Sequence, residues 1–290
     1  MKDEPRIFAP AMVRALWDGH KLETRRMLSP RNTYFDGGPW PKGAKLDDFD
    51  FEAATIDYGS SPNRACGPLL KVARRGADTV HRIVERTAPG DRWWVKENWQ
   101  VGMGADGPAV TYQAHPDYFY PDWLDQREFP YDSYPAKAWT YGHWLSDVLN
   151  RNGPWNSSQH TPRWASRMTL IVTGTKIQRL QDITEDEAIR EGATSRPNCS
   201  GFKSLYVGWS VDWSRVDLPF GDRSGRVLTE RDIALGDARH AFGNYVNKLH
   251  DGERWNLKPS STWDRNPWVI ATSFRVIKAN IDSEEARLAA

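Results

Sequence analysis

The hydrophobic positions near the start of the chain predict a short helix. Four apolar residues recur there at helical spacing: Met12, Val13, Leu16 and Trp17. Pro10 suits the first turn, where a missing N–H costs nothing, and Gly19 suits the residue that ends a helix. The segment "GHKLETRR" (19–26) is therefore expected to leave the helix as a loop that enters a strand.

Alternating apolar and β-branched positions predict strands farther along. These strands lie in three segments: "APGDRWWVKENW" (88–99), "RWASRMTLIVTGTKIQRL" (163–180) and "NPWVIATSFRVI" (266–277). "LLKVARRG" and "HRIVERTA" fit a short strand and a helix equally well. A helix over about 184–191 is predicted by Thr184 and Glu187, which are spaced as a capping box, and by Gly192, which suits its end.

Long polar and aromatic stretches separate these elements. The expected core has four segments: residues 5–30, 89–100, 163–192 and 263–279. Three irregular insertions are expected between them: residues 31–88, 101–160 and 193–262. The last includes a possible helix at 228–249. The pattern predicts one α+β domain, with a β-rich core, two short helices and long irregular decorations.

Composition narrows the class of protein. Lys plus Arg number 39 and Asp plus Glu number 38, so no overall positive field favours a nucleic-acid coat protein. Two widely separated cysteines suit a reducing cytoplasm. The start "MKDEPRIFAP" has no signal-peptide core, and no apolar run approaches the roughly 20 residues of a membrane span. A cytoplasmic protein without membrane contact is expected. The fifteen tryptophans build core, or a few of them stack on a nucleobase.

Neither a metal site nor a phosphate loop is predicted. The seven histidines form none of the pairs typical of metal ligands, and the chain contains no GxxxxGK[ST] motif. No cofactor is therefore expected.

Lys21 and Thr24 are candidates for nucleophilic chemistry. A threonine becomes a nucleophile when a base takes its proton, and a lysine is such a base only when it is neutral. Burial, or the positive charges of the neighbouring Arg25 and Arg26, would lower the pKa of Lys21. A solvated, positively charged helix end accounts for the same residues.

Glu191 is the candidate acid. It falls in the last turn of the predicted helix, where the negative end of the dipole raises the pKa of a carboxyl, as a proton donor requires. An ordinary surface glutamate fits equally well. Glu23, the acid within the charged segment, is set aside.

The segment "GHKLETRR" resembles the signature of the ASCH domain, GxKxx[E/T]xR, at four positions: Gly19, Lys21, Thr24 and Arg26. That resemblance implies a small β-barrel of PUA-like fold, associated with RNA or modified nucleosides. Threonine at the sixth position is similar to the small bacterial N4-acetylcytidine amidohydrolases. "PGDRWWV", "TLIVTGTKIQRLQDITEDEAIREG" and "PWVIATSFRVI" follow in the order of that family's core. About a third of the chain also resembles phage and prophage ASCH-like proteins.

The resemblance implies roles for individual residues. Lys21 would be the general base, Thr24 the nucleophile and Glu191 the proton donor. Arg26 would orient the site or hold a carbonyl or phosphate oxygen.

A wall of the site is implied at "PRWASR" (162–167), where Trp164 would stack on a base and Arg163 or Arg167 would reach phosphate. A strand start with a core tryptophan and surface arginines accounts for that segment equally well.

Two main functions compete. The first is an amidohydrolase that removes an acyl group from the exocyclic amine of a modified cytosine-type base, nucleoside or nucleotide. The second is a non-catalytic PUA-like module that binds RNA or modified DNA. A nuclease lacks support, since no paired-carboxylate metal site is visible, and a phage structural role ranks last.

Overall fold

A computed structural model describes most of the chain. It covers residues 1–57, 69–104, 107–114, 118–119, 155–197, 207–216, 229–252 and 260–289. The chain divides into two compact units made of interleaved segments. Unit 1 comprises Met1, Asp18–Asp91 and Ile171–Arg275; unit 2 comprises Lys2–Trp17, Arg92–Leu170 and Val276–Ala290. The single domain expected from the sequence stays a prediction.

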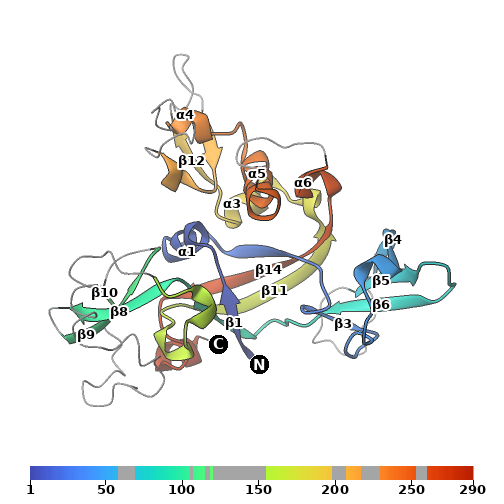
Figure 1. The fold of residues 1–290 in the computed structure, drawn as a ribbon, viewed down its shortest axis with the longest axis horizontal. Helices are drawn as coiled ribbons and strands as arrows, with labels where there is room; N and C mark the ends of the chain where they lie inside the picture. The colour runs from blue at the N-terminus through green and yellow to red at the C-terminus, as the bar shows by residue number, and fades with distance from the viewer. Residues whose placement is uncertain are drawn as a thin grey trace. The chain divides into compact units, whose positions relative to one another are not determined.

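The largest sheet has five strands in the order β1-β7-β11-β14-β2. Their bounds are β1 Asp3–Ile7, β7 Arg92–Lys96, β11 Thr169–Arg179, β14 Trp268–Ile277 and β2 Glu23–Met27. β1 pairs in parallel with β7, and β2 pairs antiparallel with β14. The two longest, β11 and β14, lie side by side, and both belong partly to each unit (Figure 1). The three strands predicted from alternation are confirmed as β7, β11 and β14.

Local signals predicted the two helices next to the charged segment correctly. α1 spans Pro10–Trp17 and buries its apolar stripe, and Gly19 takes the left-handed conformation at φ 76°. α3 spans Glu185–Arg190 behind a capping box between Thr184 and Glu187. Both helices are held at their ends by groups only a few residues away, so the sequence alone defines them.

The first insertion is not irregular as expected. It contains a four-stranded sheet in the order β3-β6-β5-β4. Its strands are β3 Thr33–Phe35, β4 Phe49–Asp57, β5 Leu69–Arg74 and β6 Val80–Glu85. "LLKVARRG" and "HRIVERTA" therefore contain strands. The prediction failed because three of the four strands have at most six residues, too few for a clear alternation. Apolar residues of this sheet pack with Ile177 and Ile270 of the main sheet.

The other insertions also contain regular elements. β8 Trp99–Gly104, β9 Gly107–Tyr112 and β10 Tyr118–Phe119 form a three-stranded sheet, and β12 Thr194–Pro197 pairs with β13 Val207–Ser210. The helices are α4 Glu230–Ile233, α5 Ala238–Asp251, α6 Thr262–Arg265 and α7 Glu284–Leu288. Short 3-10 turns are η1 Leu46–Asp48, η4 Ser158–His160, η5 Arg163–Ala165, η6 Leu180–Asp182 and η7 Trp213–Arg215. The helix expected at 228–249 is thus two helices. Much of residues 101–160, and parts of 193–262, lie outside the described residues.

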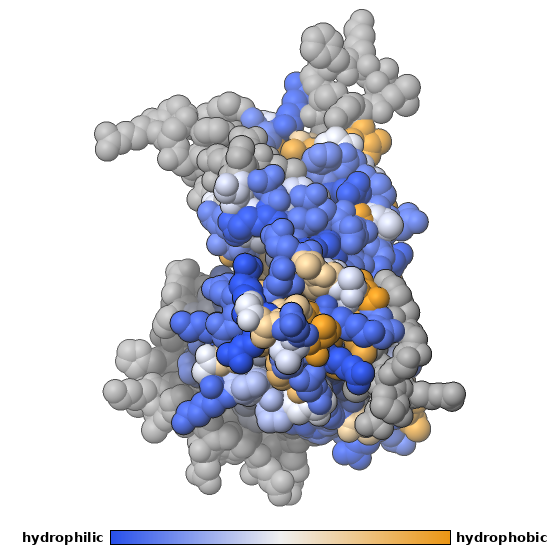
Figure 2. Space-filling view, turned by 90° about the vertical axis from the view of Figure 1, so that its right-hand side faces the viewer, coloured by the Kyte–Doolittle hydropathy of each residue, from blue (hydrophilic) through white to orange (hydrophobic). Residues whose placement is uncertain are grey.

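The fold class is mixed α+β and rich in strands. The small closed barrel expected from the resemblance is not present in the described residues, because each of the four sheets ends in open edges. None of the helices in the described part of the chain has the length and apolarity needed to cross a membrane. On the face shown in Figure 2 the described surface is mostly hydrophilic, with hydrophobic residues gathered in smaller patches.

Candidate functional site

Lys21 and Glu191 meet in the interior of unit 1. Lys21 Nζ lies 2.5 Å from Glu191 Oε2 and donates a second hydrogen bond, of 2.9 Å, to the Glu191 carbonyl oxygen. Their side chains are 1% and 3% exposed. Lys21 lies between the stop at Gly19 and β2, Glu191 caps the C-terminus of α3, and an isolated antiparallel bridge joins the two residues. The local signals at each helix end thus bring together residues 170 positions apart.

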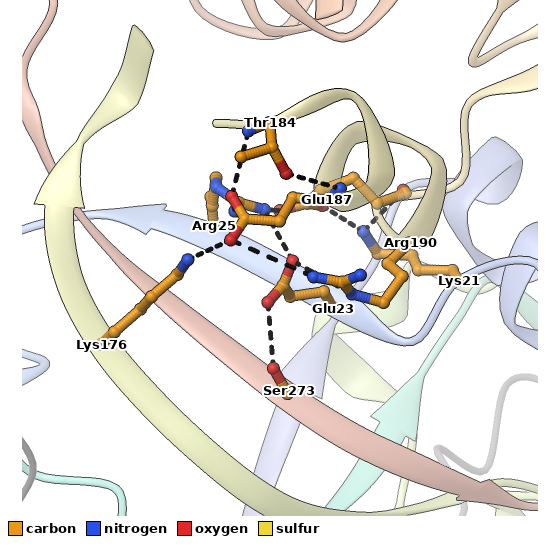
Figure 3. Close-up of polar contacts among 9 residues, drawn as sticks. Lys21, Glu23, Arg25, Lys176, Thr184, Glu187, Arg190 and Ser273 are labelled. Atoms are coloured by element: carbon orange, nitrogen blue, oxygen red, sulfur yellow. Dashed lines mark hydrogen bonds and ion pairs between the residues drawn. The ribbon is translucent and has the colours of Figure 1, made fainter. Parts of the chain in front are cut away.

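Arg25 on β2 links this pair to two more carboxylates. Its Nη1 lies 3.1 Å from both Glu191 and Glu23, and its Nη2 lies 2.6 Å from Glu187 (Figure 3). The Arg25 side chain is 1% exposed, and its guanidinium lies 6.0 Å from the ring centroid of Phe242 on α5. One guanidinium therefore bridges three acids out of reach of water.

Further groups hold those acids from outside. Ser273 Oγ on β14 donates to Glu23 at 2.9 Å, and the exposed Lys176 on β11 pairs with Glu187. Arg190 reaches Glu23 at 3.8 Å and Glu187 at 4.0 Å. We call these seven charged residues the charge network: Lys21, Glu23, Arg25, Lys176, Glu187, Arg190 and Glu191. Its four cations and three carboxylates come from β2 and Lys21 just before it, from β11, and from α3 and its C-cap Glu191 (Figure 3).

Two residues of the network have shifted pKa values. Burial lowers the pKa of Lys21 from 10.5; Glu191 opposes this shift, and the positive charges of Arg25 and Arg26 add to it. Burial acts to raise the pKa of Glu187, but Lys176 and Arg25 outweigh burial, and that pKa lies below 4.5. The pKa of Lys21 is thus shifted in the direction that a general base requires.

Thr24 and Arg26 occupy alternate positions on β2. Thr24 is buried opposite Thr272 of β14, and Arg26 lies opposite Ile270. Successive side chains of a strand point to opposite faces, so Thr24 and Arg26 face away from the side that presents Glu23 and Arg25 to α3. The structure therefore brings Lys21 and Glu191 into contact. Thr24 is only three residues from Lys21 in the sequence, but its side chain lies on the other face of β2.

The wall predicted at residues 162–167 belongs to unit 2, and its side chains already have partners within the protein. Arg167 is 2% exposed and forms two hydrogen bonds of 2.9 Å to Glu97, with Tyr112 against its guanidinium at 4.1 Å. This arginine is therefore part of the interior rather than a surface phosphate ligand.

Arg163 and Trp164 also make internal contacts. Arg163 pairs with Asp282 at 2.7 Å and Asp3 at 2.6 Å, and hydrogen bonding to Asp282 raises its pKa. The ring of Trp164 lies edge-on to Trp99, with centroids 5.7 Å apart. The proposed contacts of these residues with a base or phosphate stay predictions.

Reasoning from the sequence gave no role to Lys176 or Arg190 of the network, and it set Glu23 aside. Glu23 is 2% exposed and holds both Arg25 and Ser273, although it had been given no role. Glu187 had been recognised only as a helix cap. A signal was present: Lys21, Glu23 and Arg25 alternate at every second position, as side chains on one face of a strand do.

In the described part of the chain, no three His, Cys, Asp or Glu residues are grouped so that they could hold a metal ion. Comparisons with known proteins find no family model, curated protein or solved structure that matches this chain.

Proposed function

We propose that this protein is an amidohydrolase of PUA-like type that removes an acyl group from the exocyclic amine of a modified cytosine-type base, nucleoside or nucleotide. One observation carries the proposal: Lys21, with a lowered pKa, lies buried against Glu191 in the same ASCH-like segment as Thr24. The resemblance of "GHKLETRR" to the ASCH signature supplies the substrate class and the PUA-like fold.

In the proposed reaction neutral Lys21 takes the hydroxyl proton of Thr24, and Oγ1 attacks the acyl carbonyl carbon. The proton that Lys21 took passes to Glu191, 2.5 Å away, and Glu191 gives it to the leaving amine as the C–N bond of the tetrahedral species breaks. Water then hydrolyses the acyl-threonine to release the carboxylic acid. Arg26 orients the acyl oxygen.

This chemistry makes two demands on the protein. Lys21 is 1% exposed, so substrate entry requires the C-terminal turn of α3 to move. Thr24 Oγ1 must also come within hydrogen-bond distance of Lys21 Nζ in the reactive state. The second demand concerns the segment between Gly19 and Arg26, where a loop becomes a strand.

The test is hydrolysis of N4-acetylcytidine and related N4-acylated nucleosides and nucleotides by the purified full chain. Thr24→Ala is expected to lower kcat/KM at least about a hundredfold, while Thr24→Ser retains measurable turnover because it keeps a hydroxyl. Lys71→Met, at an exposed lysine of β5, is the control and should match the wild type. Undiminished turnover in Thr24→Ala would rule out the mechanism.

A second candidate, a non-catalytic module that binds RNA or modified DNA, is favoured by the internal ion pairs that join Lys21 and Arg25 to Glu191. Such pairing is typical of a structural network. This alternative predicts salt-dependent RNA binding without turnover of any acylated base. Arg26→Ala and Trp164→Ala would weaken that binding.

A further inference from the structure

Unit 1 contains a cavity of about 770 Å³ that involves none of the charge network. It lies among the ends of β2 and β14, the turn and strand η1–β4, and the helices α5 and α6. Its apolar lining consists of Met27, Leu28, Leu46, Phe51, Pro267 and Trp268. The volume is within the range of about 300–1,000 Å³ typical of small-molecule sites.

The cavity is lined by both positively and negatively charged side chains, and its two arginines already have partners within the protein. Arg179 lies over the Trp268 ring at 4.4 Å and donates to the carbonyl oxygens of Phe51 at 2.8 Å and Asn266 at 3.3 Å. Arg265 donates to Asp251 at 3.1 Å and to Thr262 at 2.7 Å. Arg265 and Asp251 therefore compensate each other, and the N–H groups of Arg179 point into the main chain.

Two carboxylates remain uncompensated. Asp47 on η1 and Glu52 on β4 line the cavity, and neither side chain has a partner within the described residues. Both belong to the same wall, while His250 lies with Asp251 and Arg265 on the helical wall. A ligand thus meets apolar and aromatic surface, two carboxylates without an ion-pair partner among the described residues, and one guanidinium, that of Arg179, whose hydrogen bonds go to carbonyl oxygens; with Asp251 and Arg265, three carboxylates face two guanidiniums.

We propose that this cavity binds an organic cation with a flat apolar body, such as an aryl amidinium or an arylalkyl ammonium. An amidinium matches a carboxylate through two parallel N–H···O bonds, which are stronger than neutral hydrogen bonds. Aromatic ring faces attract cations, and Trp268 already accepts the guanidinium of Arg179 in this way. The site is separate from the proposed hydrolytic residues, so either proposal can fail without the other.

The test is calorimetric titration of the full chain with three compounds of the same shape and different charge. Benzamidine is cationic, benzamide is its neutral counterpart and benzoate is anionic. Benzamidine is expected to bind about tenfold more tightly than benzamide, because only the cation forms charge-assisted bonds to Asp47 and Glu52, and benzoate is expected to bind most weakly. Equal affinities for benzamidine and benzamide, or no binding of either, would overturn the proposal.

The double variant Asp47→Asn/Glu52→Gln assigns the binding to this cavity. Both residues are exposed, so the variant is expected to fold and to melt within a few degrees of the wild type. It should lose the roughly tenfold preference for benzamidine while its affinity for benzamide stays unchanged. The matched control is Asp57→Asn, which removes a carboxylate of β4 that pairs with Lys71 and does not line the cavity. Wild-type preference in the double variant, or loss of preference in the control, would contradict the assignment.

Discussion

Lys21 is a buried cation whose pKa is lowered in the folded protein. In the pH window between this lowered value and 10.5, the unfolded chain binds more protons at this residue than the folded chain does. The contribution of Lys21 to stability therefore grows as pH rises through that window. We predict that the free energy of unfolding of the wild type increases relative to that of Lys21→Met between pH 8 and pH 10, measured by urea titration. Lys71→Met, at an exposed lysine, is the control for the mere loss of a positive charge. The prediction would be contradicted if the difference in free energy of unfolding between wild type and Lys21→Met did not change between pH 8 and pH 10.

Arg25 pairs with three buried carboxylates, and without it Glu23 would keep only the 3.8 Å contact to Arg190 as an ion pair. We predict that Arg25→Met lowers the free energy of unfolding by on the order of 3–5 kcal/mol at pH 7, as measured by urea denaturation. Arg190→Met in the same network should cost less than about 1 kcal/mol, because that side chain is 44% exposed and its ion pairs are long. Equal losses for the two variants would show that burial does not govern the network.

The cost of Arg25→Met should also depend on pH. The pKa of Glu187 is below 4.5 in the folded protein, partly because of Arg25, so the stability that its ionised form contributes is present above pH 4.5 and lost as pH falls through the lowered value. The difference between wild type and variant should shrink over that acidic range.

At the scale of the element, α3 connects a local cap to the charge network. Thr184 Oγ1 accepts from the Glu187 N–H, and the Glu187 carboxylate accepts from Thr184 N at 3.2 Å while also pairing with Arg25. Thr184→Ala is expected to cost at least about 1 kcal/mol in urea unfolding, the usual loss for a cap, plus the effect of a freer Glu187. Ser283→Ala, which removes the equivalent cap of α7, is the control and should show the cap loss alone. A smaller loss at Thr184 than at Ser283 would contradict this account.

Elements were predictable where their signals were local. α1 and α3 carry their own stops and caps, and β11 and β14 are long enough to show alternation. The sheet β3-β6-β5-β4 was missed because its strands are stabilised by pairing partners that no local window contains. Helical periodicity likewise cannot show that the ring of Trp263 packs against Gly243 on α5. A Cβ at position 243 would lie only 2.7 Å from that ring.

At the scale of the whole molecule, each compact unit has its own buried ion pairs. Arg167 pairs with Glu97 in unit 2, whereas Arg25 pairs with its carboxylates in unit 1. We predict that Arg167→Met accelerates amide hydrogen exchange mainly in Lys2–Trp17 and in the other described segments of unit 2, because contiguous structure tends to open as one cooperative unit. Arg25→Met should act mainly in unit 1. Uniform acceleration over both units in either variant would contradict this prediction.

The sequence by itself determined the helix ends, the long strands and the segment in which candidate chemistry lies, because caps, glycine stops and alternation act over a few residues. It also indicated Lys21 and Glu191 as partners, although only through a resemblance. The tertiary structure decided that Glu23, Arg25 and Glu187 join them, that Arg167 turns inward to Glu97, and that the insertions contain sheets. Burial and ion pairing depend on which distant segments pack together, and no local pattern of residues contains that information.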